Sequence, residues 1–132
     1  MDASSIELPA SELESVVVDG ATVRVRFSRA IIIKTMTGSV EKTRWWQKGE
    51  LVFEQARLQG DLPPLPAPCA GGDIYDNIYT YRDMVPLPLN TRGRAGCDLA
   101  VEGTDLRLRV EAEALHTEME DMPKYIEHIR PE

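Results

Sequence analysis

The clearest sign of an all-β fold is the stretch Val101-Glu102-Gly103-Thr104-Asp105-Leu106-Arg107-Leu108-Arg109-Val110. After the glycine, Leu106, Leu108 and Val110 alternate with charged residues. Successive side chains of a β-strand point to opposite faces, so this alternation places the apolar residues on one face. The residues around Gly103 are typical of a turn. The stretch therefore predicts a half-buried β-hairpin.

A second stretch, Val18-Asp19-Gly20-Ala21-Thr22-Val23-Arg24-Val25-Arg26-Phe27, has the same pattern when Gly20 is aligned with Gly103. Duplication and convergence both explain such a pair. We favour convergence, because any exposed hairpin needs a turn glycine, inward aliphatic residues and outward charges. A true repeat protein would also show more than two copies. In either case the two aliphatic faces are expected to share one core.

Length and periodicity indicate one all-β domain. The chain has 132 residues, of which 42% are hydrophobic and 28% charged, as in an ordinary globular protein. No long stretch has the helical period of 3.6, and turn-forming residues separate many short apolar segments. We expect a single, mostly antiparallel two-sheet sandwich or flattened barrel of about eight to ten short strands. Residues 1–12 are expected to be loosely ordered, and residues 59–72 to form a proline-rich crossover loop. Within the fold we expect a short strand that ends at Pro9, a bend or bulge at Ser28-Arg29, turns at Lys48-Gly49 and residues 90–96, a strand at Asp73–Tyr81, a sheet edge or extended loop at Met84–Leu89, and a loop or one helical turn at residues 116–122.

Charge and cysteine content limit the kinds of partner and the cellular compartment that are expected. A net charge of −7 argues against nucleic acid and membrane partners, which select basic surfaces. The start of the chain has no pattern of a signal peptide, and the longest strongly apolar run, residues 30–33, is too short to span a membrane. Cys69 and Cys97 are expected to be free thiols. We therefore expect a cytoplasmic protein, a monomer or weak homodimer, that uses no cofactor.

Several local patterns occur together in a recognisable order. They are Trp46-Gln47, Gly60-Asp61-Leu62-Pro63-Pro64-Leu65-Pro66, Pro86-Leu87-Pro88-Leu89, the hairpin at Glu102-Gly103, and Lys124-Tyr125-Ile126-Glu127. In this series the chain resembles a family of small uncharacterised bacterial proteins that form single β domains. The resemblance implies a bacterial source and an all-β fold. It implies no activity and no site residues.

Catalytic and metal-binding patterns are poorly represented. Cys97 with His116 is the only pair that suggests a nucleophile and a base, and nothing around the cysteine indicates an activated thiolate. His116, Glu118, Glu120, Asp121 and His128 lack the tight spacing of a zinc site and the glycine-centred pattern of a calcium loop. We expect no catalytic residue and no metal site, and the sequence favours a protein that is not an enzyme.

Two groups of residues remain as candidates for binding. Arginines of the two similar hairpins would form a basic stripe if the hairpins lay side by side, and would suit an acidic partner. The alternative is a solvated face that nearby glutamates neutralise. These arginines are Arg24, Arg26, Arg107 and Arg109.

Aromatic residues form the second group, because tyrosine and tryptophan are enriched in binding surfaces. Its members are Trp45, Trp46, Tyr75, Tyr79 and Tyr81. The alternative is that these rings cap the ends of a sandwich. The function that we expect is a non-catalytic protein-interaction domain that uses an aromatic patch or a sheet edge to bind another protein. A small apolar ligand-binding β-barrel is the first alternative, and an enzyme with an unrecognised site is the second.

Overall fold

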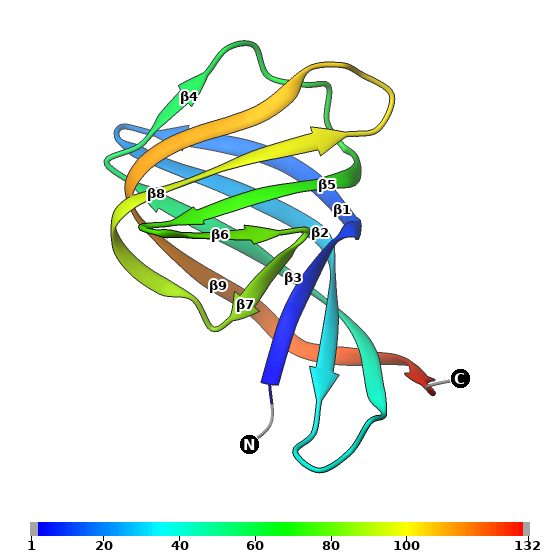
Figure 1. Ribbon diagram of the computed structural model, residues 1–132. Helices are drawn as coiled ribbons and strands as arrows, with labels where there is room; N and C mark the ends of the chain where they lie inside the picture. Colours follow the sequence, from blue (N-terminus) through cyan, green and yellow to red (C-terminus); the bar gives the residue numbers. More distant parts are fainter. Residues whose placement is uncertain (1–2, 131–132) are drawn as a thin grey trace.

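A computed structural model describes residues 3–130, which form one antiparallel sheet of nine strands (Figure 1). The strands are β1 (Ala3–Asp19), β2 (Thr22–Thr35), β3 (Lys42–Glu54), β4 (Arg57–Gln59), β5 (Ala67–Asp76), β6 (Tyr79–Arg82), β7 (Met84–Leu87), β8 (Asn90–Val101) and β9 (Arg107–Ile129). The all-β prediction and the expected number of strands are confirmed. No helix in this part of the chain has the length and apolar character needed to cross a membrane.

The sheet curves into a ring. Its neighbours run β6-β5-β8-β9-β3-β2-β1-β7, and β4 pairs with β9. Glu12 and Leu13 of β1 also pair with Pro68 and Ala67 of β5. This contact joins the two sides of the sheet, so that β1, β2, β3, β9, β8 and β5 follow one another around a closed path. Such an arrangement encloses one core and leaves few open edges.

The two similar hairpins contribute to the same core. Gly20 turns the chain between β1 and β2 with a φ of 61°, and Gly103 lies in the turn between β8 and β9 with a φ of 85°. Their inward residues are buried in one cluster that includes Val23, Val25, Phe27, Leu99, Val101, Leu108 and Val110. Larger side chains such as Phe53 and Leu51 fill the space between them. The prediction of a shared core is confirmed, except for Leu106, which lies in the turn before β9 and is 41% exposed.

The first strand differs from its prediction. Pro9 was expected to end a short strand, yet β1 continues through it, because the segment between Glu7 and Glu12 bulges out of the ladder with β2. Ser11 is fully buried in this bulge. Its hydroxyl accepts a bond from the Ile31 N–H (2.9 Å) and donates one to the Glu7 carbonyl (2.8 Å). Residues 3–12 are therefore ordered as part of β1, while residues 1 and 2 lie outside the described residues.

Three predicted boundaries were also wrong. The crossover loop covers residues 60–66 rather than 59–72, because β4 ends at Gln59 and β5 begins at Ala67. The predicted strand Asp73–Tyr81 is a hairpin, since Asn77 has a φ of 58° and turns the chain between β5 and β6. The predicted turn at residues 90–96 is instead the start of β8.

The expected turn at Lys48-Gly49 lies inside β3, and the expected loop at residues 116–122 lies inside β9. The two strands pair here, and a Cβ on Gly49 would lie 2.6 Å from the Met119 sulfur. The Met119 side chain therefore packs directly over Gly49, and a larger residue there would have to displace it. These long strands carry part of the sheet beyond the closed ring, as the β2–β3 hairpin in Figure 1 shows.

Candidate functional site

The best candidate site is the part of the sheet that extends beyond the closed ring, which we call the arm. It consists of the ends of four neighbouring strands: residues 3–7 of β1, the β2–β3 hairpin at 29–48, and residues 124–130 at the end of β9. The pairs Ile6↔Ile32, Ile32↔Trp45 and Trp45↔Tyr125 connect these strands in that order. The arm brings together residues from the start, middle and end of the chain.

Trp45 lies on the inner face of the arm. Its ring packs edge-on against Tyr125, with 5.2 Å between the ring centroids, and the Lys34 ammonium lies 4.5 Å from the Trp45 centroid. The indole N–H donates to the Thr43 hydroxyl at 2.8 Å. Tyr125 is 56% exposed. A large aromatic surface with a cation over it is thus presented to solvent, as in many protein interfaces.

Trp46 points to the opposite face, as expected for consecutive residues of a strand. The Lys124 ammonium lies 4.6 Å from its ring centroid, and the Arg29 guanidinium carbon lies 5.9 Å from the same centroid. Each tryptophan therefore has at least one cation over its ring. Cation–π contacts at exposed sites contribute about 0.5–1 kcal/mol each, which helps to order these long basic side chains.

One edge of the arm is open. Residues of β9 up to His116 pair with β8, and from Ala114 onward β9 pairs with β3. Within residues 3–130, no strand other than β3 pairs with β9 after His116. Pro123 and the positive φ of Asp121 interrupt the first part of the edge. Six residues, Lys124 to Ile129, then follow as an extended strand whose second edge is unpaired.

An apolar groove of about 410 Å³ opens on the inner side, beside this edge. Its lining residues come from five strands and the Pro88 loop: Ser4, Ile32, Lys34, Gln47, Leu87, Pro88, Thr117, Met119 and Pro123. The lining is mostly apolar, and Lys34 is its one charged residue. The groove and the open edge thus share β9.

The arm is basic although the chain is acidic. It holds seven Lys or Arg residues and three Asp or Glu residues, a net charge of +4, so the rest of the chain carries −11. Arg44 is paired with Glu127 at 2.8 Å. Lys34 and Lys124 contact tryptophan rings instead. The positive charge of the arm is therefore not fully neutralised by the contacts that its own residues make.

The predicted aromatic residues do not form one patch. Trp45 and Trp46 lie on β3, whereas Tyr75, Tyr79 and Tyr81 lie on β5 and β6. Two strands separate β3 from β5 in either direction around the ring. Tyr79 and Tyr81 stack on each other with 6.4 Å between centroids, and the Tyr81 hydroxyl bonds Asp76 at 3.2 Å. Only the tryptophans of this set belong to the arm.

The predicted basic stripe is not formed. Arg24 and Arg26 lie on β2, next to β1 and β3, whereas Arg107 and Arg109 lie where β9 pairs with β8 and β4. β9 reaches β3 only from Ala114 onward. The four arginines therefore fall into two separate clusters of ion pairs, and the alternative of a neutralised face describes them better.

The first cluster surrounds the buried Glu50. Arg24 contacts the Glu50 carboxylate at 2.7 Å, and Arg26 contacts it at 3.3 Å. Glu118 also pairs with Arg24, and Glu14 with Arg26. These hydrogen-bonded carboxylates raise the pKa of both arginines, that of Arg24 chiefly through Glu50 and that of Arg26 chiefly through Glu14. The network holds four strands together and has no spare cation for a partner.

The second cluster surrounds Asp98. The Arg107 guanidinium donates to its carboxylate at 2.6 Å, and Arg109 lies 3.7 Å from the same oxygen. Arg109 and Tyr75 line a polar groove of about 290 Å³ together with Arg94. Burial raises the pKa of Tyr75, with a further contribution from Asp98, so the phenol stays protonated at neutral pH. The groove can form hydrogen bonds but contains no activated nucleophile.

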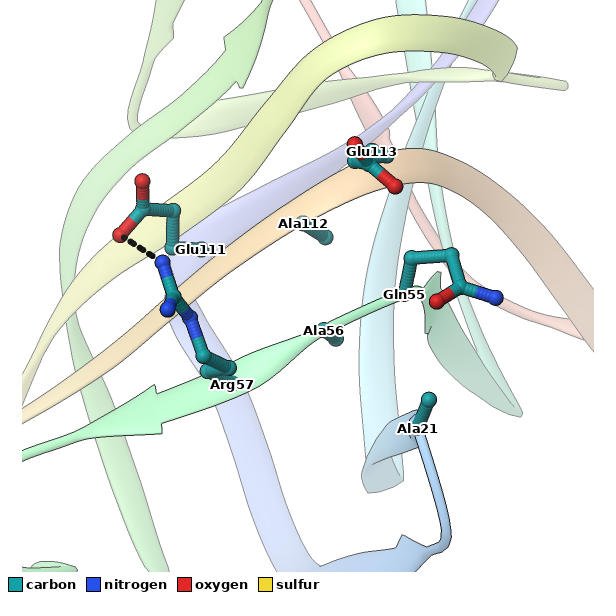
Figure 2. A pocket seen from close by; sticks show the side chains of 7 residues that line it. All are labelled: Ala21, Gln55, Ala56, Arg57, Glu111, Ala112 and Glu113. Carbon is teal, nitrogen blue, oxygen red and sulfur yellow. Dashed lines mark ion pairs between the residues drawn. The ribbon is translucent and has the colours of Figure 1, made fainter.

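A larger hollow of about 470 Å³ lies where β3 gives way to β4 (Figure 2). Gln55 has a φ of 50° and the Ala56 N–H bonds the Ala21 carbonyl, so the ladder with β9 is interrupted here. Figure 2 shows Arg57 and Glu111 pointing toward each other, at 3.5 Å, while Gln55 lies apart from them. Such an exposed ion pair contributes at most about 1 kcal/mol to the stability of the fold. The hollow therefore results from the interruption of strand pairing and not from a set of binding side chains.

The groups considered for catalysis lie apart. Cys97 is buried in the core, whereas His116 lies on a partly exposed face with Glu118 3.6 Å away. His128 contacts Glu41 at 2.9 Å. Among residues 3–130, no group of three or more His, Cys, Asp or Glu side chains is placed to hold a metal ion. The two constellations that were considered, Cys97 with His116 and the acidic residues with His128, are therefore not assembled by the described residues.

The two free thiols are expected to be unreactive in the folded protein. Burial raises the pKa of both Cys69 and Cys97. At pH 8 we expect a disulfide reagent to label them at least about 100-fold more slowly in the native protein than in urea. In the unfolded chain thiols ionise from about pH 8.5 upward, while the folded thiols stay neutral. The free energy of unfolding should therefore be unaffected by these thiols below that pH and should fall as pH rises above it. Rapid labelling of the native protein at pH 8 would contradict the expected lack of reactivity.

Comparison of the chain with protein-family models, with curated proteins and with solved structures gave no match. The arm itself is therefore the feature that bears on function.

Sequence reasoning missed Tyr125, Lys34 and Lys124 as members of the site. Their grouping with the tryptophans depends on the register of β2, β3 and β9. The charge pattern was a usable signal, because residues 29–48 contain five basic residues and one acidic residue in an acidic chain. Such a local reversal of charge gives this surface an electrostatic potential opposite in sign to that of the rest of the chain.

Proposed function

We propose that the protein is a non-catalytic protein-interaction domain that binds another protein through the arm. The observation that supports this most is the unpaired edge of β9 from Lys124 to Ile129, beside the exposed Tyr125 and the half-buried Trp45 on which it packs. Folded proteins usually cover or interrupt such edges, because an open strand pairs readily with another chain. An edge that is left open next to aromatic residues is therefore suited to a partner.

The alternative of a carrier for a small apolar ligand receives less support. The interior of the ring is occupied by large buried side chains, such as Phe53, Leu51 and Leu108. The apolar groove of the arm lies at the surface and is open. Because the groove lies beside β9, it is suited to receive one side chain of a partner that pairs along this strand.

The proposal is tested by partner capture followed by direct binding. Partner capture uses three baits: the tagged protein, its Tyr125→Ala variant and its Tyr79→Ala variant. Each captured protein is then purified, and its binding to each of the three baits is measured by calorimetry. Tyr79 is the matched control, since it is 60% exposed but lies on β6, away from the arm. We expect Tyr125→Ala to weaken direct binding at least about tenfold, as for an aromatic interface residue. Equal binding by both variants, or no directly binding partner, would overturn the proposal.

A further inference from the structure

From the charge, the groove and the open edge we infer that the partner segment is an extended acidic peptide with apolar residues at alternate positions, which adds as a strand to Lys124–Ile129 of β9. This inference rests on the proposed function and specifies the chemistry of the occupant. Three observations support it independently.

The first observation is the backbone of the edge. Lys124 to Ile129 is extended, with a one-residue bulge at Ile126 where the register with β3 shifts, and β3 occupies one side of it alone among residues 3–130. An added strand would pair with the N–H and C=O groups on the second side. A segment of six residues has the usual length of a strand in a globular protein. Main-chain pairing of this kind supplies affinity with little dependence on sequence.

The second observation is the groove. It is lined by Met119 and Pro123 of β9, next to the edge, and by Ile32 and Leu87 across the inner face. Alternate side chains of an added strand point to the same face. One set would therefore lie on the side of the groove and of Tyr125, where apolar residues are favoured. The other set would lie on the outer side, near Lys124 and Trp46.

The third observation is charge. The arm carries +4, and Lys34 and Lys124 stand at the groove and at the edge, over tryptophan rings. An acidic segment is attracted to this surface, while the −11 of the remaining chain repels it elsewhere and so directs it to the arm. Two copies paired edge to edge would instead bring two +4 surfaces together. A second copy of this chain is therefore disfavoured as the occupant.

Nucleic acid fits these observations less well, although it is also acidic. Trp46 has Lys124 and Arg29 near its ring, and Trp45 has Tyr125 and Lys34. Neither ring is left as a free stacking platform, which single-stranded nucleic acid requires. A polynucleotide would also make no use of the backbone groups at the β9 edge.

The test uses a fluorescein-labelled ten-residue peptide of alternating glutamate and valine, titrated with the full chain by fluorescence anisotropy. A lysine–valine peptide is the charge control. A glutamate–valine peptide with N-methyl groups on two consecutive central residues is the backbone control, because it keeps the charge but cannot pair on either edge. We expect each control peptide to bind at least about tenfold more weakly, as expected when charge complementarity or main-chain pairing is lost.

Protein variants locate the site. Lys124→Glu should weaken binding of the glutamate–valine peptide at least about tenfold, whereas Arg57→Glu, which also changes an exposed cation but lies away from the arm, should leave it unchanged. Amide hydrogen exchange of Lys124 to Ile129 should slow when the peptide is bound. Absence of binding, equal binding of the N-methylated peptide, tighter binding of a ten-nucleotide thymidine strand, or dimerisation of the chain through this edge would overturn the inference.

The two proposals fail in different ways. If a captured partner depends on Tyr125 but is not displaced by the glutamate–valine peptide, the acidic-strand inference is wrong and the interaction function stands. If captured partners do not depend on Tyr125, both proposals are wrong.

Discussion

Gly72→Ala is expected to lower the free energy of unfolding by about 4 kcal/mol. Gly72 has a φ of 144°, a conformation that costs a residue with a Cβ about 1–3 kcal/mol. The added Cβ would also lie 2.2 Å from the Asp98 carbonyl oxygen and 2.8 Å from the Leu99 Cα. Both are backbone atoms of β8, which pairs with β5 and β9 and therefore cannot move away cheaply.

Gly60→Ala is the matched control for this prediction. Gly60 also has a positive φ, 76°, but a Cβ there would meet nothing within 4 Å. Its cost should be limited to backbone strain of about 1–2 kcal/mol. Urea unfolding followed by far-ultraviolet circular dichroism measures both variants. Equal destabilisation would show that the contact between β5 and β8 is not the cause.

Phe53→Ala is expected to lower the free energy of unfolding by about 3–5 kcal/mol. Phe53 is fully buried on β3, between Val23 of β2 and Leu115 of β9. Removing its ring loses apolar burial and leaves a cavity that the closed ring of strands cannot collapse to fill. A loss of this size is a large part of the stability of an ordinary domain, which is about 5–15 kcal/mol.

The same unfolding experiment measures this second prediction. Ile78→Ala serves as its control, because Ile78 is 90% exposed in the turn between β5 and β6 and should change stability by less than about 0.5 kcal/mol. A Phe53→Ala variant that loses less than about 1 kcal/mol would mean that the ring does not enclose a well-packed core.

The closed ring and the arm differ in how their strands are paired. The ring buries its apolar residues and pairs nearly all of its edges, so it gives the domain its stability. The arm shares β1, β2, β3 and β9 with the ring but extends past β5 and β8, and its last strand is consequently unpaired on one side. Substitutions such as Lys124→Glu should therefore change binding with little effect on folding.

Several fold features could be predicted because they depend on residues close in the chain. The hairpins at Gly20 and Gly103 follow from alternation and turn chemistry, and both occur where expected. The irregularity near Ser28 in β2 and the edge position of β7 were also predicted correctly. In each case the controlling interactions lie within a few residues, as in hairpins generally.

Long strands were misjudged because proline, glycine and polar residues were taken as ends. Pro9 lies in a bulge of β1, and Pro123 lies in a bulge of β9, between Glu120 and Lys124, where the register with β3 shifts. Gly49 lies inside β3 because Met119 of β9 packs against it. A residue that ends a strand when it is alone is tolerated when a neighbouring strand supplies the pairing or needs the space.

Four features can be read from the amino-acid sequence: the all-β class, the two hairpins, their shared core and the basic character of residues 29–48. Which candidate residues come together depends instead on how distant strands pair. The register of β2, β3 and β9 separates the tyrosines from the tryptophans, divides the four arginines between two clusters, and places Tyr125 and Lys34 beside Trp45. The physical reason is that strand pairing is set by contacts between distant residues, and a shift of one residue would turn every side chain to the other face.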